Sequence, residues 1–169
     1  NVEKVSAVAP FRDGDVVLFV GDSITRGGLF HSNLFLYYTT RYPQLKLRFY
    51  NSGRSGDNAV GTLARLPWDG LQHQPDVAVV MLGMNDAVVG QPQDRQVANL
   101  EKLVAALKDA GCRVVQAYRN RSKAIAVGDI RRVCDDVGLT IDSLHGHFGD
   151  DLDPSSEDET IRSYTVDFY

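Results

Sequence analysis

The stretch VVLFVGDSITRGG at residues 16–28 begins as a continuous apolar run and ends in a small, acidic, hydroxyl-bearing turn. Such a run is typical of a β-strand that is covered on both faces, as in a parallel sheet. The turn that follows either links this strand to a helix or presents Ser23 to a substrate. Asp and Ser are both common helix caps, so the turn by itself leaves the two interpretations about equal.

Four further apolar runs predict strands, and helical patterns lie between them. The five predicted strands are residues 16–20, 45–51, 76–82, 112–118 and 138–142. The predicted helices are residues 32–42, residues 57–73, an apolar stripe over 97–107 that Gly111 ends, and a second stripe over 130–137 that Gly138 ends. This alternation predicts an α/β protein with a five-stranded parallel sheet between two layers of helices.

The 169 residues are enough for one domain with a sizeable core. We expect this domain over residues 1–148 and an acidic, flexible tail over residues 149–169. The net charge of -4 argues against nucleic-acid binding, and no apolar run approaches the ~20 residues that cross a bilayer. The chain begins at Asn1, so removal of an export signal is an open alternative, and we expect a secreted or periplasmic rather than a cytoplasmic location.

The two cysteines, Cys112 and Cys134, fall on a predicted strand and a predicted helix. This placement favours buried free thiols over a disulfide or a metal site. The acidic tail lacks the glycine and the spacing of a calcium loop, and no nucleotide-binding GxGxxG or GxxxxGK[ST] motif follows the first strand. We therefore expect neither a metal nor a cofactor.

Three unusual loops each follow a predicted strand, namely GDSITRGG at 21–28, NSGRSGDN at 51–58 and GMND at 83–86. Sites in open parallel sheets form beyond the carboxyl ends of the strands, so the three loops should open at one edge of the sheet. Ser23 is a candidate nucleophile, and the carboxamide of Asn85 is a neutral donor suited to a developing oxyanion.

Each loop also has a plainer interpretation. The second loop, taken singly, is a strand-to-helix turn capped by Ser55 or Asp57. The third loop, taken singly, is an Asx-turn. These plainer interpretations are favoured for either loop alone.

Together, the blocks GDSIT, SGD and GMND, in this order and on successive strands, resemble the SGNH hydrolases, also called the GDSL family. The resemblance covers residues 11–118 well and implies a flavodoxin-like three-layer α/β/α sandwich. It also implies serine ester hydrolysis with Ser23 as the nucleophile. The oxyanion hole would consist of the main-chain N–H groups of Ser23 and Gly56 and the side chain of Asn85.

The general base is less well marked. The family completes its site with an Asp-x-x-His block before a C-terminal helix, and the predicted tail contains no such block. The chain's Asp-x-x-His is Asp142-Ser-Leu-His145, whose spacing fits although its context, TIDSLHGHF, resembles the family's last strand. Asp142 and His145 are thus the candidate pair, with His147 as an alternative base. We expect His31 to be a surface or packing residue and His73 to lie at a helix end.

These observations predict a hydrolase that acts by acyl transfer on a small-molecule ester. The segment PFRDGDVVLFVGDSITRGG at 10–28 resembles SGNH members of the carbohydrate-esterase kind, which implies removal of a small, acetyl-like group from a carbohydrate or another polar carrier. Three alternatives are a non-catalytic or truncated relative that lacks the base, a lysophospholipase or thioesterase, and a phosphate-binding or nucleotide-binding turn. The missing nucleotide motifs rank the last of these lowest.

Overall fold

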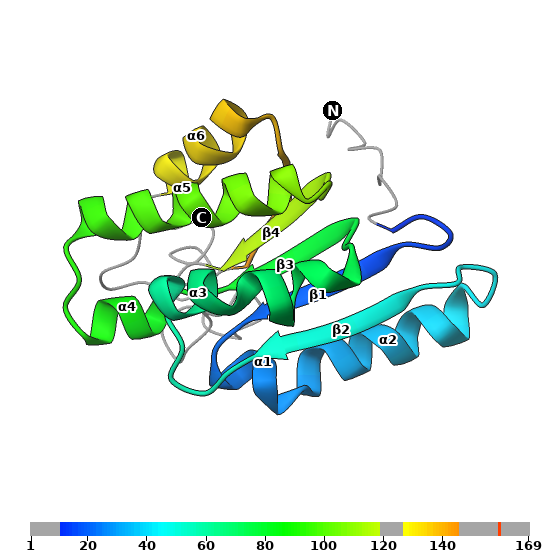
Figure 1. Ribbon diagram of the computed structural model, residues 1–169. Helices are drawn as coiled ribbons and strands as arrows, with labels where there is room; N and C mark the ends of the chain where they lie inside the picture. The colour runs from blue at the N-terminus through cyan, green and yellow to red at the C-terminus, as the bar shows by residue number, and fades with distance from the viewer. Residues whose placement is uncertain (1–10, 119–126, 146–158, 160–169) are drawn as a thin grey trace.

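The computed structural model describes residues 11–118, 127–145 and 159, and these residues form a five-stranded parallel sheet with helices on both faces (Figure 1). The strands are β1 Val16–Gly21, β2 Arg48–Gly53, β3 Val77–Met81, β4 Val114–Tyr118 and β5 Thr140–His145. They lie in the order β2-β1-β3-β4-β5, and all neighbouring strands are parallel. The predicted fold class is confirmed, and the carboxyl ends of the strands meet at one edge.

Helices flank the sheet as separate layers. The described helices are α1 Ser23–Gly27, α2 Leu29–Arg41, α3 Ala59–Asp69, α4 Met84–Val88, α5 Gln93–Asp109 and α6 Val127–Val137, with a short 3₁₀ helix, η1, over Leu71–His73. In Figure 1, α2 runs along one face of the sheet, and α3, α5 and α6 lie on the other. The helices α1 and α4 and the start of α3 gather near the carboxyl ends of the strands (Figure 1).

The alternating side chains of β1 build a hydrophobic core on each face of the sheet. Leu18 and Val20 join the larger cluster, to which α3, α5 and α6 contribute. Val17 and Phe19 join the cluster on the opposite face, against which α2 packs. All four side chains are fully buried, and burying such a side chain contributes roughly 1.5–3 kcal/mol. The continuous apolar run of β1 is thus explained by two covered faces.

The strand β2 begins later than predicted. The main-chain N–H of Lys46 donates to Oδ1 of Asp13 at 2.8 Å, so the chain before Arg48 belongs to a loop and not to the ladder. Residues 52 and 53, predicted as loop, are instead the last two residues of β2 and pair with residues 20 and 21 of β1. The predicted second loop is therefore shorter, because sheet pairing continues into it.

The predicted helix over residues 57–73 is divided in two. The helix α3 ends at Asp69, and η1 follows as a separate turn. His73 lies at the end of η1, as predicted, and its ring stacks on Tyr50 of β2 with 3.9 Å between the ring centroids. This stacking holds η1 against the edge strand.

The strand β5 also begins later than predicted, at Thr140. The N–H of Leu139 donates to the carbonyl oxygen of Cys134 at 2.9 Å, so this residue completes the end of α6 before the strand starts. The predicted tail over residues 149–169 lies outside the described residues, apart from residue 159.

Cys112 and Cys134 are buried free thiols, as predicted. Cys112 lies just before β4, not within it, and its Sγ–H donates to the carbonyl oxygen of Pro75 at 3.3 Å. Burial raises the pKa of the Cys112 thiol to about 12, and burial also raises the pKa of Cys134. Both are structural thiols in the interior.

Candidate active site

Ser23 is the first residue of α1, and one residue, Asp22, separates it from the end of β1. Its side chain is exposed, whereas Asp22 is 2% exposed. Oδ1 of Asp22 accepts the N–H of Ile24 at 2.9 Å and so caps α1. The capping interpretation therefore applies to Asp22, and the hydroxyl of Ser23 is left on the surface at a helix start.

The loop after β1 lies directly against the end of β2. A Cβ added to Gly53 would lie 2.2 Å from the main-chain nitrogen of Arg26, so only glycine allows α1 to approach β2 this closely. The N–H of Arg54 donates to the carbonyl oxygen of Gly21 at 3.0 Å. Nη1 of Arg26 donates to Oγ of Ser55 at 3.3 Å. The first two predicted loops are thus joined by main-chain and side-chain contacts.

Gly56 lies in the turn between β2 and α3 with a backbone φ of +74°, a conformation that favours glycine. The turn is closed by a hydrogen bond of 3.1 Å from the N–H of Asp57 to the carbonyl oxygen of Arg54. A Cβ added to Gly56 would meet nothing within 4 Å, so its main chain is open to a small molecule. Within the described part of the chain, no hydrogen bond uses the N–H of Gly56.

The cap of α3 is Asn58, not Ser55 or Asp57. Oδ1 of Asn58 accepts the N–H of Gly61 at 2.9 Å. Asp57 turns inward instead, and its Oδ2 accepts hydrogen bonds from Thr62 at 2.8 Å and from Nε of Arg65 at 2.7 Å. The carboxylate of Asp57 therefore anchors the end of this loop to the buried face of α3.

Asn85 joins the third loop to the second. The GMND segment begins α4 with Gly83 as its N-cap, so the Asx-turn interpretation is wrong. Nδ2 of Asn85 donates to the main-chain carbonyl oxygen of Asp57 at 2.7 Å. The next residue, Asp86, is 1% exposed, and its Oδ2 accepts the N–H of Ala59 at 3.2 Å, at the start of α3.

Buried charge surrounds this edge of the sheet. Asp22, Asp57 and Asp86 are buried carboxylates, and Arg65, at 3% exposure, is the buried cation paired with Asp57. Burial raises the pKa of Asp22 and of Asp86, and the neighbouring charge of Asp57 raises both further.

The structure describes His31 and His73 with their side chains, but only the backbone of His145. The backbone of Asp142 and His145 belongs to β5, and His145 ends that strand at the carboxyl edge of the sheet. The side chains of this pair, and the whole of His147, lie outside the described residues. His31 packs on Phe19 with 4.9 Å between ring centroids, and burial lowers its pKa, which fits the predicted packing role. The Asp142–His145 pairing stays a prediction.

Arg65 is a site residue to which the loop motifs do not point. The signal lies in the helical spacing of α3, because Ala59, Thr62 and Leu66 mark its buried stripe and Arg65 falls on the same stripe. An arginine in that position requires buried acceptors, and polar loop residues just before the helix are the nearest candidates. Helix periodicity therefore could have identified Arg65.

None of the helices within the described residues is long and apolar enough to cross a membrane. In the same part of the chain, no group of three or more His, Cys, Asp or Glu side chains could hold a metal ion.

Comparison with known proteins gives a family and a partial relative. The model of the GDSL-like Lipase/Acylhydrolase family matches residues 19–161. An arylesterase from Vibrio mimicus is 42% identical over 65 residues, which are 38% of this chain and 32% of the arylesterase. The chain thus matches about a third of the length of this relative.

Solved structures share the fold. A gut microbial diltiazem-metabolizing enzyme superposes with a TM-score of 0.65 and 25% identity over 80% of this chain and 38% of that chain. An alpha/beta hydrolase enzyme from the metagenome of Lake Arreo, Spain, has a TM-score of 0.65 and 21% identity over 95% and 84% of the two chains. The acetylxylan esterase of Geobacillus stearothermophilus has a TM-score of 0.65 and 20% identity over 78% and 77%.

Proposed function

Because the chain belongs to the GDSL-like lipase/acylhydrolase family, we propose that it is a serine ester hydrolase whose nucleophile is Ser23. The observation that carries this proposal is the junction of the three loops at one sheet edge. The N–H of Arg54 donates to the carbonyl oxygen of Gly21, and Asn85 donates to Asp57 beside Gly56. An exposed hydroxyl, a free main-chain N–H and a carboxamide are thereby gathered on neighbouring loops.

In the proposed reaction, Oγ of Ser23 attacks the ester carbonyl carbon while a histidine accepts the hydroxyl proton. The oxyanion of the tetrahedral intermediate accepts hydrogen bonds from the N–H groups of Ser23 and Gly56 and from Nδ2 of Asn85. The intermediate expels the alcohol, which takes the proton from the histidine. Water then attacks the acyl-serine, with the histidine again as base, and releases the acid. We assign the base to His145, oriented by Asp142, with His147 as the alternative.

We propose a small acyl group on a polar carrier as the substrate. The side chains of Arg26, Arg54 and Ser55 are exposed beside the nucleophile loop, where they can donate hydrogen bonds to the hydroxyl groups of a carbohydrate. An acetylxylan esterase with this fold is a precedent for such a carrier on the same scaffold.

A second candidate substrate, an ester with an aryl or longer acyl group, is favoured by a different observation. Large aliphatic side chains are exposed within the first loop or shortly after the other two, namely Ile24 at 44%, Val60 at 50%, Val88 at 78% and Val89 at 66%. Exposed apolar side chains at a site rim are suited to an apolar ligand. The arylesterase relative is in accord with this candidate.

Labelling with a fluorophosphonate probe tests the proposed activity, because the probe reacts with an activated serine. We expect labelling of the wild type and of Ser32→Ala, a control at an exposed serine of α2, but none of Ser23→Ala. Labelling of Ser23→Ala would assign the reactive serine elsewhere. Absence of labelling in all three proteins would support a non-catalytic relative that lacks the base.

A panel of esters separates the two candidate substrates. We expect kcat/KM to be highest for an acetylated xylooligosaccharide if the polar side chains of the rim bind the carrier. A higher value for phenyl acetate or for an octanoyl ester would favour the second candidate and assign the rim to an apolar group. Substitution of Val88 by Ser should then lower kcat/KM for the octanoyl ester but not for the acetylated sugar.

A further inference from the structure

Arg65 of α3 lies beneath the site with 3% of its surface exposed, and its guanidinium contacts the ends of two strands and one loop. Nη2 donates to the carbonyl oxygens of Ser52 at 2.9 Å and of Gly21 at 3.4 Å. Nη1 donates to Oγ of Ser52 at 2.7 Å, and Nε donates to Oδ2 of Asp57 at 2.7 Å. One side chain thus binds the last residues of β1 and β2 and the loop after β2.

The partners of Arg65 stand next to the three proposed oxyanion donors. Gly21 precedes Ser23 by two residues, and Asp57 directly follows Gly56. The main-chain carbonyl oxygen of Asp57 accepts the hydrogen bond from Asn85 at 2.7 Å. Ser23 and Gly56 are therefore close in sequence to a residue that the guanidinium binds, and Asn85 is hydrogen-bonded to one.

The chemistry of the guanidinium suits it to this task. Its nitrogens form a flat, rigid fork, so the acceptors it binds are held at set distances from one another. The neighbouring side chain of α3, Leu66, is almost fully buried in the core cluster that also contains Leu18 and Val20, so it already attaches the helix to the sheet. A buried ion pair adds little to stability compared with an apolar residue of similar volume, so the geometry that Arg65 imposes explains an arginine at this position better than stability does.

We propose that Arg65 is a positioning residue that sets the spacing of the Ser23, Gly56 and Asn85 donors for the oxyanion. The inference rests on the proposed function, since it assigns Arg65 to the same site. Arg65 does not touch the substrate and acts through Gly21, Ser52 and Asp57.

Arg65→Lys is the test variant, because it keeps a positive charge beside Asp57 but lacks the fork. Misplaced donors should lower kcat per folded molecule by about tenfold to 100-fold with little change in KM, because the donors act mainly in the transition state. The folded fraction of each protein is measured by circular dichroism. A kcat of Arg65→Lys at the wild-type level would overturn the proposal, and if this variant does not fold, Ser52→Ala decides by the same criterion.

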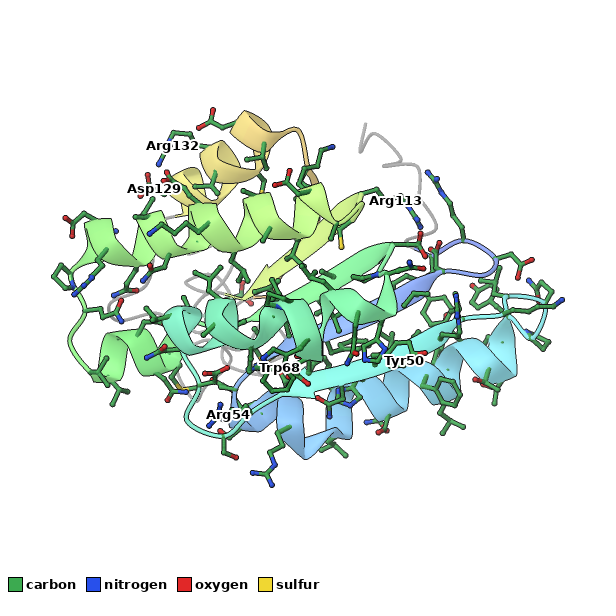
Figure 2. The ribbon with its side chains drawn as sticks, in the orientation of Figure 1. Tyr50, Arg54, Trp68, Arg113, Asp129 and Arg132 are labelled. Carbon is green, nitrogen blue, oxygen red and sulfur yellow. The ribbon has the colours of Figure 1, made fainter. Side chains whose placement is uncertain are left out.

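Arg113→Lys is the matched control. Arg113 also pairs with a buried aspartate, Asp15, but lies at the opposite end of the sheet from Arg54, which follows β2 (Figure 2). We expect Arg113→Lys to lower the melting temperature without changing kcat per folded molecule. An equal fall in kcat in both lysine variants would show a general loss of stability and overturn the positioning role.

A readout without turnover separates this inference from the proposed function. Hydrogen exchange of the Asn85 side-chain amide, followed by ¹⁵N NMR, reports the Asn85–Asp57 bond directly. We expect faster exchange in Arg65→Lys than in the wild type and in Arg113→Lys. If the wild type neither hydrolyses esters nor binds the fluorophosphonate probe, the proposed function fails, and unchanged exchange in Arg65→Lys would separately overturn the role of Arg65.

Discussion

Nδ2 of Asn85 donates a hydrogen bond of 2.7 Å to the main-chain carbonyl oxygen of Asp57, and this bond joins the loop after β3 to the loop after β2. A carboxamide nitrogen carries two hydrogens, so one remains for a ligand while the other holds the side chain in place. The carbonyl oxygen of Asp57 thereby orients the donor beside Gly56. In the proposed mechanism the carboxamide is therefore preorganised, because it does not need to turn when the oxyanion forms.

Asn85→Ala should lower kcat by about 100- to 1,000-fold, the usual effect of removing one oxyanion donor. The fold should be retained, because Asn85 is only partly buried and Asp86 still binds the start of α3. Turnover of a p-nitrophenyl ester and circular dichroism measure the two effects. Asn33→Ala, an exposed asparagine of α2, serves as the control with wild-type turnover, and unchanged turnover in Asn85→Ala would remove Asn85 from the mechanism.

Gly53→Ala tests the close contact between α1 and β2. The added Cβ would lie 2.2 Å from the nitrogen of Arg26, which belongs to the backbone and cannot rotate away. Overpacking of this kind costs about 1–3 kcal/mol, and displacement of α1 should also lower turnover. Urea unfolding measures the free energy. In the control Gly27→Ala the new Cβ meets nothing within 4 Å, so equal destabilisation of the two variants would contradict the contact.

The layers of the fold could be predicted because burial leaves a periodic signal. The run over residues 16–20 is apolar at every position, and both faces of β1 are indeed covered. The start of β2 could not be predicted in the same way, because it depends on pairing with β1 and on the side chain of Asp13. These are contacts between segments far apart in the chain, and local periodicity does not contain them.

The individual loop contacts were less predictable than the loops themselves. Asp22, Ser55, Asp57 and Asn58 are all suitable helix caps by residue type. The structure uses Asp22 and Asn58 as caps, because Asp57 is bound by Arg65 and Thr62 of α3. The pairing of each side-chain oxygen with an N–H group depends on such distant partners. The motifs therefore predicted which loops meet at the sheet edge, but not the hydrogen bonds within those loops.

The thiols of Cys112 and Cys134 should resist modification in the folded protein. Both are 1% exposed, and burial raises the pKa of Cys112 to about 12, so the reactive thiolate is scarce. Reaction with a disulfide reagent such as DTNB at mildly alkaline pH should release no rapid colour from the native protein. After unfolding in guanidinium chloride, both cysteines should react. Rapid reaction of the native protein would show that one thiol is accessible.

Asp86 provides a prediction on pH and stability. Its carboxylate is 1% exposed and accepts the N–H of Ala59. Burial raises its pKa above the ordinary value of 3.8, and the charge of Asp57 adds to the rise. The folded state therefore binds a proton at pH values where the unfolded chain has already lost it. The stability contributed by protonated Asp86 is complete below the unfolded pKa and is lost as the pH rises through the folded pKa.

Asp86→Asn removes this titration, because asparagine is neutral at every pH and its side-chain oxygen can still accept the N–H of Ala59. The free energy of unfolding of Asp86→Asn minus that of the wild type should therefore increase as the pH rises from about 4 and become constant once wild-type Asp86 is fully ionised. Urea unfolding of both proteins in matched buffers between about pH 4 and 7 measures this difference. A difference that stays constant or falls over this range would show that burial does not disfavour the ionised carboxylate, since the wild type would then gain nothing from protonation at this position.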